Sequence, residues 1–181
     1  IMTNINNKLL IENIYTNIIK TSRNKTFFLD FNVDDTVEGR FDIIILHSFI
    51  IFNFFIHTND QKSSLPQMLF DHMFHDFDSS LREMGFGDIA VNKRMKQFIK
   101  AFYGRIENYS KSLSHYNDLA DDTLLKKTIL RNIYKDKEIH TNCIDFWRDY
   151  IINNVNDINA KTLQENTSQL FMFKMSNDYG K

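Results

Sequence analysis

Hydrophobic residues recur at helical spacing along most of this 181-residue chain. Between residues 70 and 84, large apolar side chains fall on one face of a helix with 3.6 residues per turn: Phe70, Met73, Phe74, Phe77, Leu81 and Met84. Between residues 91 and 113, spacings of three and four alternate: Val91, Met95, Phe98, Phe102, Ile106, Tyr109 and Leu113. The short connection between these segments predicts an antiparallel helical hairpin over residues 68–113.

The most apolar run, residues 43–56, is 14 residues long and includes His47. A membrane-spanning helix needs ~20 apolar residues, so this run predicts a central helix of a protein core rather than a transmembrane span. His47 is accordingly expected to be a hydrogen-bonded core residue. Pro66 suits the first turn of the first hairpin helix, where its missing N–H is not needed. Further helices are expected over residues 9–20, 119–134 and 144–155.

Turn and cap signals mark the ends of these elements. Residues 31–40 predict a loop, in which Asp35 or Thr36 can cap the central helix that follows. Gly85 suits the left-handed position that ends the first hairpin helix, and Asp88 can cap the second.

The chain is expected to form a single compact all-α domain over residues 1–181. One proline and five glycines leave few helix breakers, and no repeat or flexible linker divides the sequence. The helical pattern weakens over residues 157–181. Five phenylalanines are expected in the core: Phe41, Phe74, Phe77, Phe98 and Phe102.

Charge and cysteine content restrict the class of protein. A formal net charge of −1 argues against a global electrostatic grip on nucleic acid, and no DNA partner is expected. The single cysteine, Cys143, cannot form an intramolecular disulfide; a small buried hydrophobe in a reducing compartment is the simplest interpretation. The first residues lack the basic and arginine-rich patterns of targeting segments, so no presequence is expected.

Histidines and carboxylates cluster in the first hairpin helix. His72 and His75 lie one helical turn apart, with Asp71 and Asp78 beside them, so a metal-dependent enzyme is geometrically allowed. These side chains are expected opposite the apolar stripe, however, where they face solvent and form pairs four residues apart. The sequence also lacks GxSxG, P-loop, GxGxxG and HExxH motifs. We therefore expect no metal, no cofactor and no catalytic residues.

Basic side chains gather on the second hairpin helix. Residues 92–111 carry six bases and one acid. Solvation alone explains lysines taken singly, but a stripe this dense also suits an anionic partner such as RNA or lipid headgroups. Two of the bases, Arg94 and Arg105, lie nearer the core edge and are expected to anchor acids of a neighbouring helix. The basic face is predicted to consist of Lys93, Arg94, Lys96, Lys100, Arg105 and Lys111.

Three segments of the sequence resemble a known protein family, which periodicity and charge alone do not indicate. The stretch DTVEGRFDIIILH (35–47), the stretch from Leu69 to Arg105 and LRNIY (130–134) resemble the ubiquinol–cytochrome c chaperone family, with the best-matched core over residues 35–135. The resemblance carries over these positions: Asp35, Thr36, Gly39, Arg40, Phe41, His47, Asp71, Phe74, Asp78, Leu81, Arg82, Glu83, Met84, Gly85, Gly87, Asp88, Lys93, Arg94, Lys96, Phe102, Tyr103, Gly104 and Arg105.

The resemblance implies an all-α, non-catalytic chaperone. Its partner is expected to be newly made cytochrome b or another subunit of respiratory complex III, met near the ribosome or an anionic membrane surface. The implied location is the bacterial cytoplasm, peripheral on the inner membrane, or the matrix side of the inner membrane in a mitochondrion. His72 and His75 lie outside the family pattern. Two alternatives stay open: the metal-dependent enzyme, and an adaptor that binds lipid surfaces through the lysines and an apolar groove.

Overall fold

Seven helices make up the secondary structure of the described part of the chain. The computed structural model describes residues 2–58, 64–161 and 171–175, and no strand occurs among them. The helices are α1 (Met2–Ser22), α2 (Lys25–Leu29), α3 (Val37–His57), α4 (Leu65–Glu83), α5 (Asp88–Leu119), α6 (Thr123–Tyr134) and α7 (Thr141–Asn159). The predicted all-α fold is confirmed.

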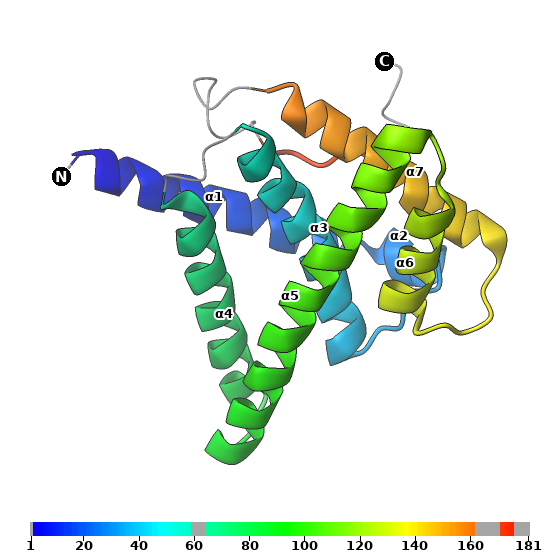
Figure 1. Cartoon of the computed structure of the whole chain (residues 1–181). Coiled ribbons are helices and arrows are strands. Elements are labelled where there is room, and N and C mark those ends of the chain that lie inside the picture. The colour runs from blue at the N-terminus through cyan, green and yellow to red at the C-terminus, as the bar shows by residue number, and fades with distance from the viewer. Residues whose placement is uncertain (1, 59–63, 162–170, 176–181) are drawn as a thin grey trace.

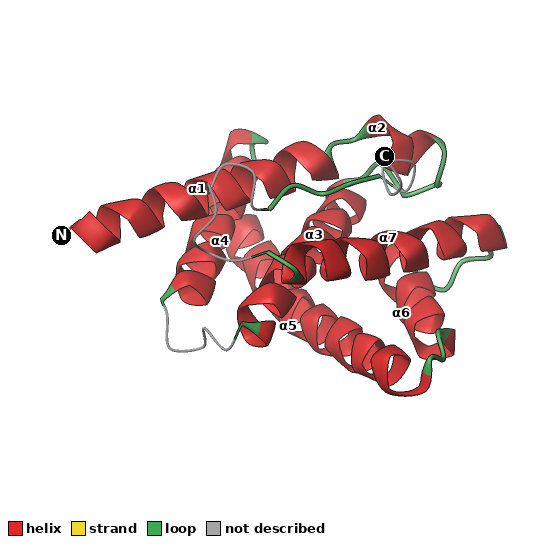
Figure 2. Cartoon of the chain, turned by 90° about the horizontal axis from the view of Figure 1, so that it is seen from above, coloured by secondary structure: helices red, strands yellow, loops and turns green. Residues whose placement is uncertain are grey.

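The apolar helix α3 lies at the centre of the molecule. Helices α1, α5, α6 and α7 all pack against it. Both views place α1 and α4 on one side of α3, and α6 and α7 on the other (Figures 1 and 2). By length and composition α3 could cross a membrane, but 72% of its most apolar window is buried inside the protein. The prediction of a central core helix is therefore confirmed.

Helices α4 and α5 form the predicted hairpin, whose turn lies at the lowest point of Figure 1. Gly85 follows the C-cap of α4 with a φ of 90°, the left-handed conformation that glycine adopts without strain. The five phenylalanines predicted in the core are only 3–7% exposed. Phe41 of α3 stacks on Phe98 of α5, with ring centroids 4.0 Å apart, so aromatic packing joins the hairpin to the central helix.

The start of α3 differs from the prediction. The loop expected over residues 31–40 is shorter, because α3 begins at Val37. Thr36 is the N-cap, and its hydroxyl accepts a hydrogen bond from the Gly39 N–H at 3.0 Å, so one of the two predicted caps is confirmed.

Two other expectations about helix ends were wrong, and one short helix was missed. Gly87 is the N-cap of α5, and Asp88 is its first residue, with a carboxylate that pairs with Arg82 instead of capping. The helix expected from residue 119 begins at Thr123, because α5 continues to Leu119 and ends at a left-handed residue. The short helix α2 was not predicted, because five residues are too few to show a helical period.

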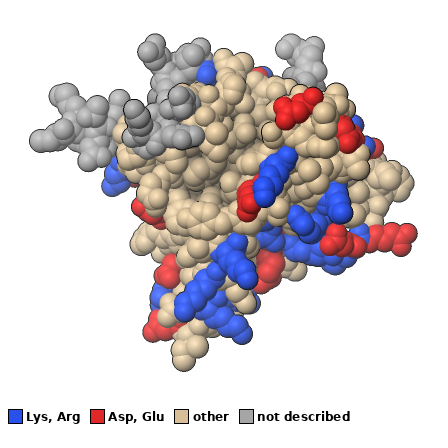
Figure 3. Space-filling view, in the orientation of Figure 1, with Lys and Arg blue, Asp and Glu red and all other residues tan. Residues whose placement is uncertain are grey.

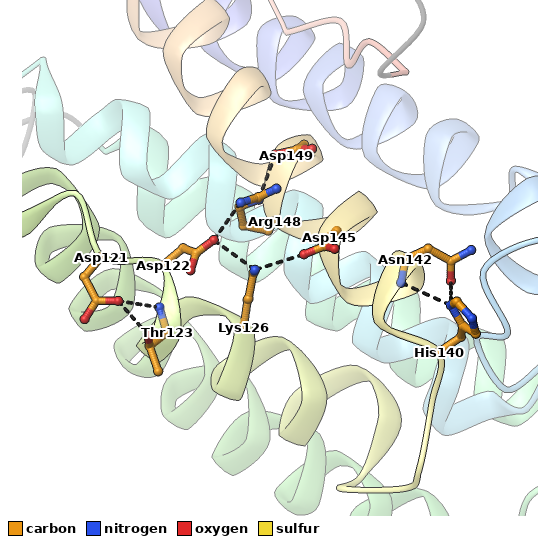
Figure 4. Close-up of polar contacts among 9 residues, drawn as sticks. All are labelled: Asp121, Asp122, Thr123, Lys126, His140, Asn142, Asp145, Arg148 and Asp149. Carbon is orange, nitrogen blue, oxygen red and sulfur yellow. Dashed lines mark hydrogen bonds and ion pairs between the residues drawn. The ribbon is translucent and has the colours of Figure 1, made fainter.

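An ion-pair network fixes α6 against α7 (Figure 4). Asp122, just before α6, accepts from Lys126 at 3.1 Å and from Arg148 of α7 at 2.6 Å. Lys126 also reaches Asp145 of α7 at 3.0 Å. Single exposed pairs contribute little, but shared partners hold several side chains in one geometry.

The two helical glycines of α3 and α5 provide a matched pair of substitutions. A Cβ on Gly39 would overlap the backbone carbonyl of Asp34, whereas a Cβ on Gly104 would meet no atom within 4 Å. We expect Gly39→Ala to lower the free energy of unfolding by about 1–3 kcal/mol, the usual cost of overpacking. Gly104→Ala should raise it by about 0.5–1 kcal/mol, because alanine is the better helix former. Urea denaturation measures both; equal effects at the two positions would contradict the close approach at Gly39.

Candidate functional site

An open groove with a volume of about 550 Å³ lies beside the hairpin. The C-terminal ends of α1 and α4, the short helix α2 and the first turns of α3 form its walls. Its inner surface includes the partly buried Phe28 and Ile44 and the buried Phe41 and Phe77. The volume falls within the range of about 300–1,000 Å³ that is typical of ligand pockets, so the groove can accept an apolar group.

Exposed apolar side chains also occur at the rim of this groove. Leu29 of α2 is 74% exposed, and Met84 at the end of α4 is 61% exposed. Arg40, which also lines the groove, donates to Asp35 at 2.6 Å and lies over the ring of Phe28. The hydrogen bond from Arg40 holds the pKa of Asp35 below its usual range. The rim therefore combines apolar surface with one compensated ion pair.

Two exposed bases, Arg23 and Lys25, also border the groove. Neither forms an ion pair with any residue that the structure describes. On the α4 wall, the Tyr15 hydroxyl of α1 donates to Asp76 at 2.5 Å, and burial raises the pKa of Tyr15. The two bases therefore outnumber the single carboxylate of Asp76 among the groove residues without an ion pair to a described residue, so this part of the rim is positive on balance.

The histidines and acids of α4 do not converge on a metal site. Asp71 and His75 are exposed, Asp78 pairs with an arginine one turn on, and His72 lies edge-on to Tyr15 of α1 with ring centroids 5.0 Å apart. The expectation that His72 faces solvent was wrong, because α1 covers this side of α4. Within residues 2–58, 64–161 and 171–175, no group of three or more potential ligands could hold a metal ion.

The basic face is smaller than the sequence indicated. Lys93, Lys96 and Lys100 are exposed, and none of them forms an ion pair with a described residue. Lys111 pairs with Glu107 at 2.5 Å, one turn earlier on the same helix. We therefore define the lysine row as Lys93, Lys96 and Lys100.

The two arginines of the predicted basic face bind α3 instead. Arg94 pairs with Glu38 at 2.7 Å, and Arg105, which is 18% exposed, pairs with the buried Asp42 at 2.7 Å. Lys135, just after α6, also contacts Asp42. The expectation that both arginines anchor acids of a neighbouring helix is confirmed, and their inclusion in a partner-binding face stays a prediction.

His47 is a structural residue. Its side chain is fully buried, its Nδ1 lies 2.8 Å from the Ile43 carbonyl and 3.2 Å from the Ser22 hydroxyl, and its Nε2 lies 2.8 Å from the Tyr150 hydroxyl. Because a carbonyl can only accept, Nδ1 carries the hydrogen and Nε2 accepts from Tyr150. Burial lowers the pKa of His47 to about 4, so the ring is neutral at pH 7.

Most other positions of the family pattern have visible structural roles. Phe74, Leu81 and Phe102 are buried, and Arg82 pairs with both Asp78 and Asp88. Exposed positions with no core contact are Asp71, Glu83, Met84 and Gly87, whereas the exposed Tyr103 lies against Phe70 and the buried Phe102.

The groove residues of α1 and α2 were not predicted from the sequence. In the segment 26–31, Phe27 is buried in the core, Phe28 lines the groove and Leu29 faces solvent. Three consecutive apolar residues carry no periodic signal that distinguishes these environments. The one sequence signal for a groove here was Leu29, an apolar residue in a segment too short to show the periodicity of a helix.

The family model of ubiquinol–cytochrome c chaperones matches residues 29–163, well over half of the chain. The chain belongs to this family. A crystal structure of the Cbp3 homolog from Brucella abortus is similar over 98% of this chain and 95% of that chain, with 27% sequence identity and a TM-score of 0.78. None of the curated proteins compared with the chain matches it. Family membership and the Cbp3-like fold point to a chaperone or assembly factor rather than to an enzyme.

The buried His47 of this chaperone predicts a specific loss of stability in acid. The pKa of His47 is about 4 in the folded chain, compared with an ordinary value of 6.5 for histidine. Between pH 4 and pH 6.5 the unfolded chain is therefore protonated at this residue while the folded chain is not. The free energy of unfolding should therefore fall by about 2 kcal/mol between pH 7 and pH 5 on account of this residue. Urea denaturation at both pH values measures the fall.

The variant His47→Gln should lose this contribution, and His75→Gln, on an exposed face, should retain it. Proton NMR of the folded protein provides a second readout that does not depend on variants. Titration of the His47 ring near pH 6.5 in the folded state would contradict its burial as a neutral residue.

Proposed function

We propose that this protein is a non-catalytic assembly chaperone that holds newly made cytochrome b, or another subunit of ubiquinol–cytochrome c reductase, before its incorporation into respiratory complex III. The family match and the structural similarity to the Cbp3 homolog support the role of a chaperone. The observation that supports this kind of client is the apolar groove between α1, α2, α3 and α4.

The groove suits an apolar helical segment of a membrane protein. Such a segment exposes large aliphatic side chains to water until it enters a bilayer, and covering them is favourable. The groove offers Phe28 and Ile44 on its inner surface and Leu29 and Met84 at its rim. The unbranched side chain of methionine adapts to differently shaped partners, which favours a holding surface over a site specific for one small ligand. Arg23 and Lys25 complement acidic residues that flank a client segment.

The lysine row supplies a second, electrostatic contact. Lys93, Lys96 and Lys100 lie on α5, apart from the groove lining, so a client and an anionic platform can be bound together. Suitable platforms are ribosomal RNA and the anionic surface of the inner membrane, both of which lie where membrane subunits are made. The corresponding location is the bacterial cytoplasm beside the inner membrane, or the matrix side in a mitochondrion.

The client prediction is tested by changing the groove rim. Leu29→Glu places a charge where the apolar client segment is expected to lie, and should reduce capture of labelled cytochrome b by about tenfold, since desolvating a charge against apolar surface is costly. Crosslinking followed by purification of the tagged chaperone from cells that synthesise complex III measures the captured client.

Leu119→Glu is the matched control, because Leu119 is 65% exposed at the far end of α5 and does not line the groove. This control should capture the client as well as the unaltered chain. Undiminished capture by Leu29→Glu would exclude the groove as the client site. Failure of the unaltered chain to capture any complex III subunit would overturn the proposed function itself.

Docking through the lysine row should depend steeply on salt. Reversing Lys93, Lys96 and Lys100 to glutamate is expected to abolish binding to ribosomes or anionic vesicles, and to leave the free energy of unfolding within about 0.5 kcal/mol, because all three side chains are exposed. Raising the salt concentration should likewise weaken the binding of the unaltered protein to ribosomes or anionic vesicles, through screening and counterion release. Sedimentation with ribosomes and flotation with vesicles measure the two platforms separately.

The reversal of Lys111 to glutamate is a control, since this residue pairs with Glu107 and lies more than two turns beyond Lys100. If docking persists after the triple reversal and at high salt, the lysine row is a solvated surface that does not bind the platform.

A further inference from the structure

The turn of the hairpin exposes large apolar side chains at the end of a protrusion. Ile89 is 88% exposed, more than any other large hydrophobic residue in the described part of the chain, and Met84 is 61% exposed. Both flank the turn at the lowest point of Figure 1. We call this pair the apolar tip. Figure 3 shows that the lowest atoms of the molecule are tan, with blue side chains gathered above them and red ones at the left edge.

The apolar tip continues the lysine row along one face of α5. Ile89, Lys93, Lys96 and Lys100 follow one another at intervals of four, three and four residues, which places them on a single helical face. The row spans roughly 16 Å along the helix, from the apolar residue at the turn to the last lysine. Each of the three lysines is exposed and lacks an ion-pair partner among the described residues.

We propose that the apolar tip inserts into the interface of an anionic lipid bilayer while the lysine row contacts the headgroups. The proposal rests on the docking role proposed above for the lysine row and names the membrane as its platform. Interfacial elements bury apolar side chains about 5–10 Å deep, and Lys93 lies about 6 Å behind Ile89 along the axis. A lysine at that distance can extend its aliphatic stem along the apolar layer and keep its ammonium group among phosphates.

The shape and chemistry of the tip favour lipid over RNA. A protruding convex end enters a bilayer without a complementary cavity, and Ile89 and Met84 carry no aromatic ring on which a nucleobase could stack. The ring of Phe86 in the turn is only partly exposed, with the guanidinium of Arg94 4.6 Å from its centroid. An RNA surface would leave the two exposed aliphatic side chains without a role.

Acidic groups restrict how the hairpin can approach the membrane. Glu83 is exposed near the turn, and Asp78 and Asp88 share the single guanidinium of Arg82. These groups belong to the α4 side of the turn, except for Asp88, which pairs back across it. The hairpin must therefore tilt so that the α5 face bearing the lysine row meets the headgroups and the α4 face points away.

Flotation of the full chain with vesicles tests insertion. The probes are vesicles of phosphatidylcholine alone and of phosphatidylcholine with about one third phosphatidylglycerol, a content chosen to give a strongly negative surface. The double variant Met84→Ser, Ile89→Ser should bind the anionic vesicles about tenfold less, because two large apolar side chains no longer leave water. Leu119→Ser, at the far end of the same helix, should bind like the unaltered protein.

A reporter on the tip distinguishes insertion from surface attraction. An environment-sensitive dye attached through Ile89→Cys should shift its emission to shorter wavelength only with anionic vesicles. The same dye at Leu119→Cys should not shift. The natural Cys143 is buried, so labelling is restricted to the introduced thiol.

The results separate this proposal from the docking it rests on. Vesicle binding that is lost in the lysine reversal but unchanged in the double serine variant, with no dye shift, would overturn insertion and leave docking intact. Loss of ribosome binding alone in the lysine reversal would overturn the membrane as platform. Light scattering tests whether the chain associates with itself through the tip. Dimers of the unaltered chain that are absent in the double serine variant would likewise overturn lipid insertion in favour of self-association.

Discussion

The structure depends on covering α3 on nearly every side. Ile43, Ile45, Phe49 and Ile51 are all fully buried, although they project in different directions around the helix. No single neighbour can cover such a helix, so α1, α5, α6 and α7 surround it. A lipid bilayer would also remove this apolar surface from water. In this protein, packing against neighbouring helices does so instead.

The long hairpin is held to this centre by a buried charge as well as by aromatic rings. Asp42 is nearly inaccessible, and both Arg105 of α5 and Lys135 after α6 reach it from different directions. Burial raises the pKa of Asp42, which Arg105 and Lys135 oppose by favouring the ionised form. Because a buried carboxylate without its partners is very unfavourable, this contact sets the positions of α5 and α6 relative to α3. It also explains why Arg105 is not available to a partner.

The attachment of α5 to α3 leaves the groove and the lysine row on different parts of the hairpin. The stack of Phe41 on Phe98 attaches α5 to α3, and the groove lies beside Phe77 where residues of α3 and α4 line it. The lysine row faces away from that core. A chaperone for a membrane subunit needs an apolar holding surface and a means of staying near the site of insertion. The groove and the lysine row share no residue, and Met84 alone belongs to both the groove rim and the apolar tip.

The family came from the resemblance of whole sequence segments, whereas local patterns in the sequence determined the six longer helices, the hairpin and the central position of residues 43–56. These features are encoded by local periodicity and turn residues such as Gly85, which act over a few residues. Only the tertiary structure decided which bases remain free, because Arg94 and Arg105 meet Glu38 and Asp42 more than fifty residues earlier in the chain. The groove was likewise decided by packing: its lining comes from five helices, and no periodic pattern within one segment records where separate helices leave a gap.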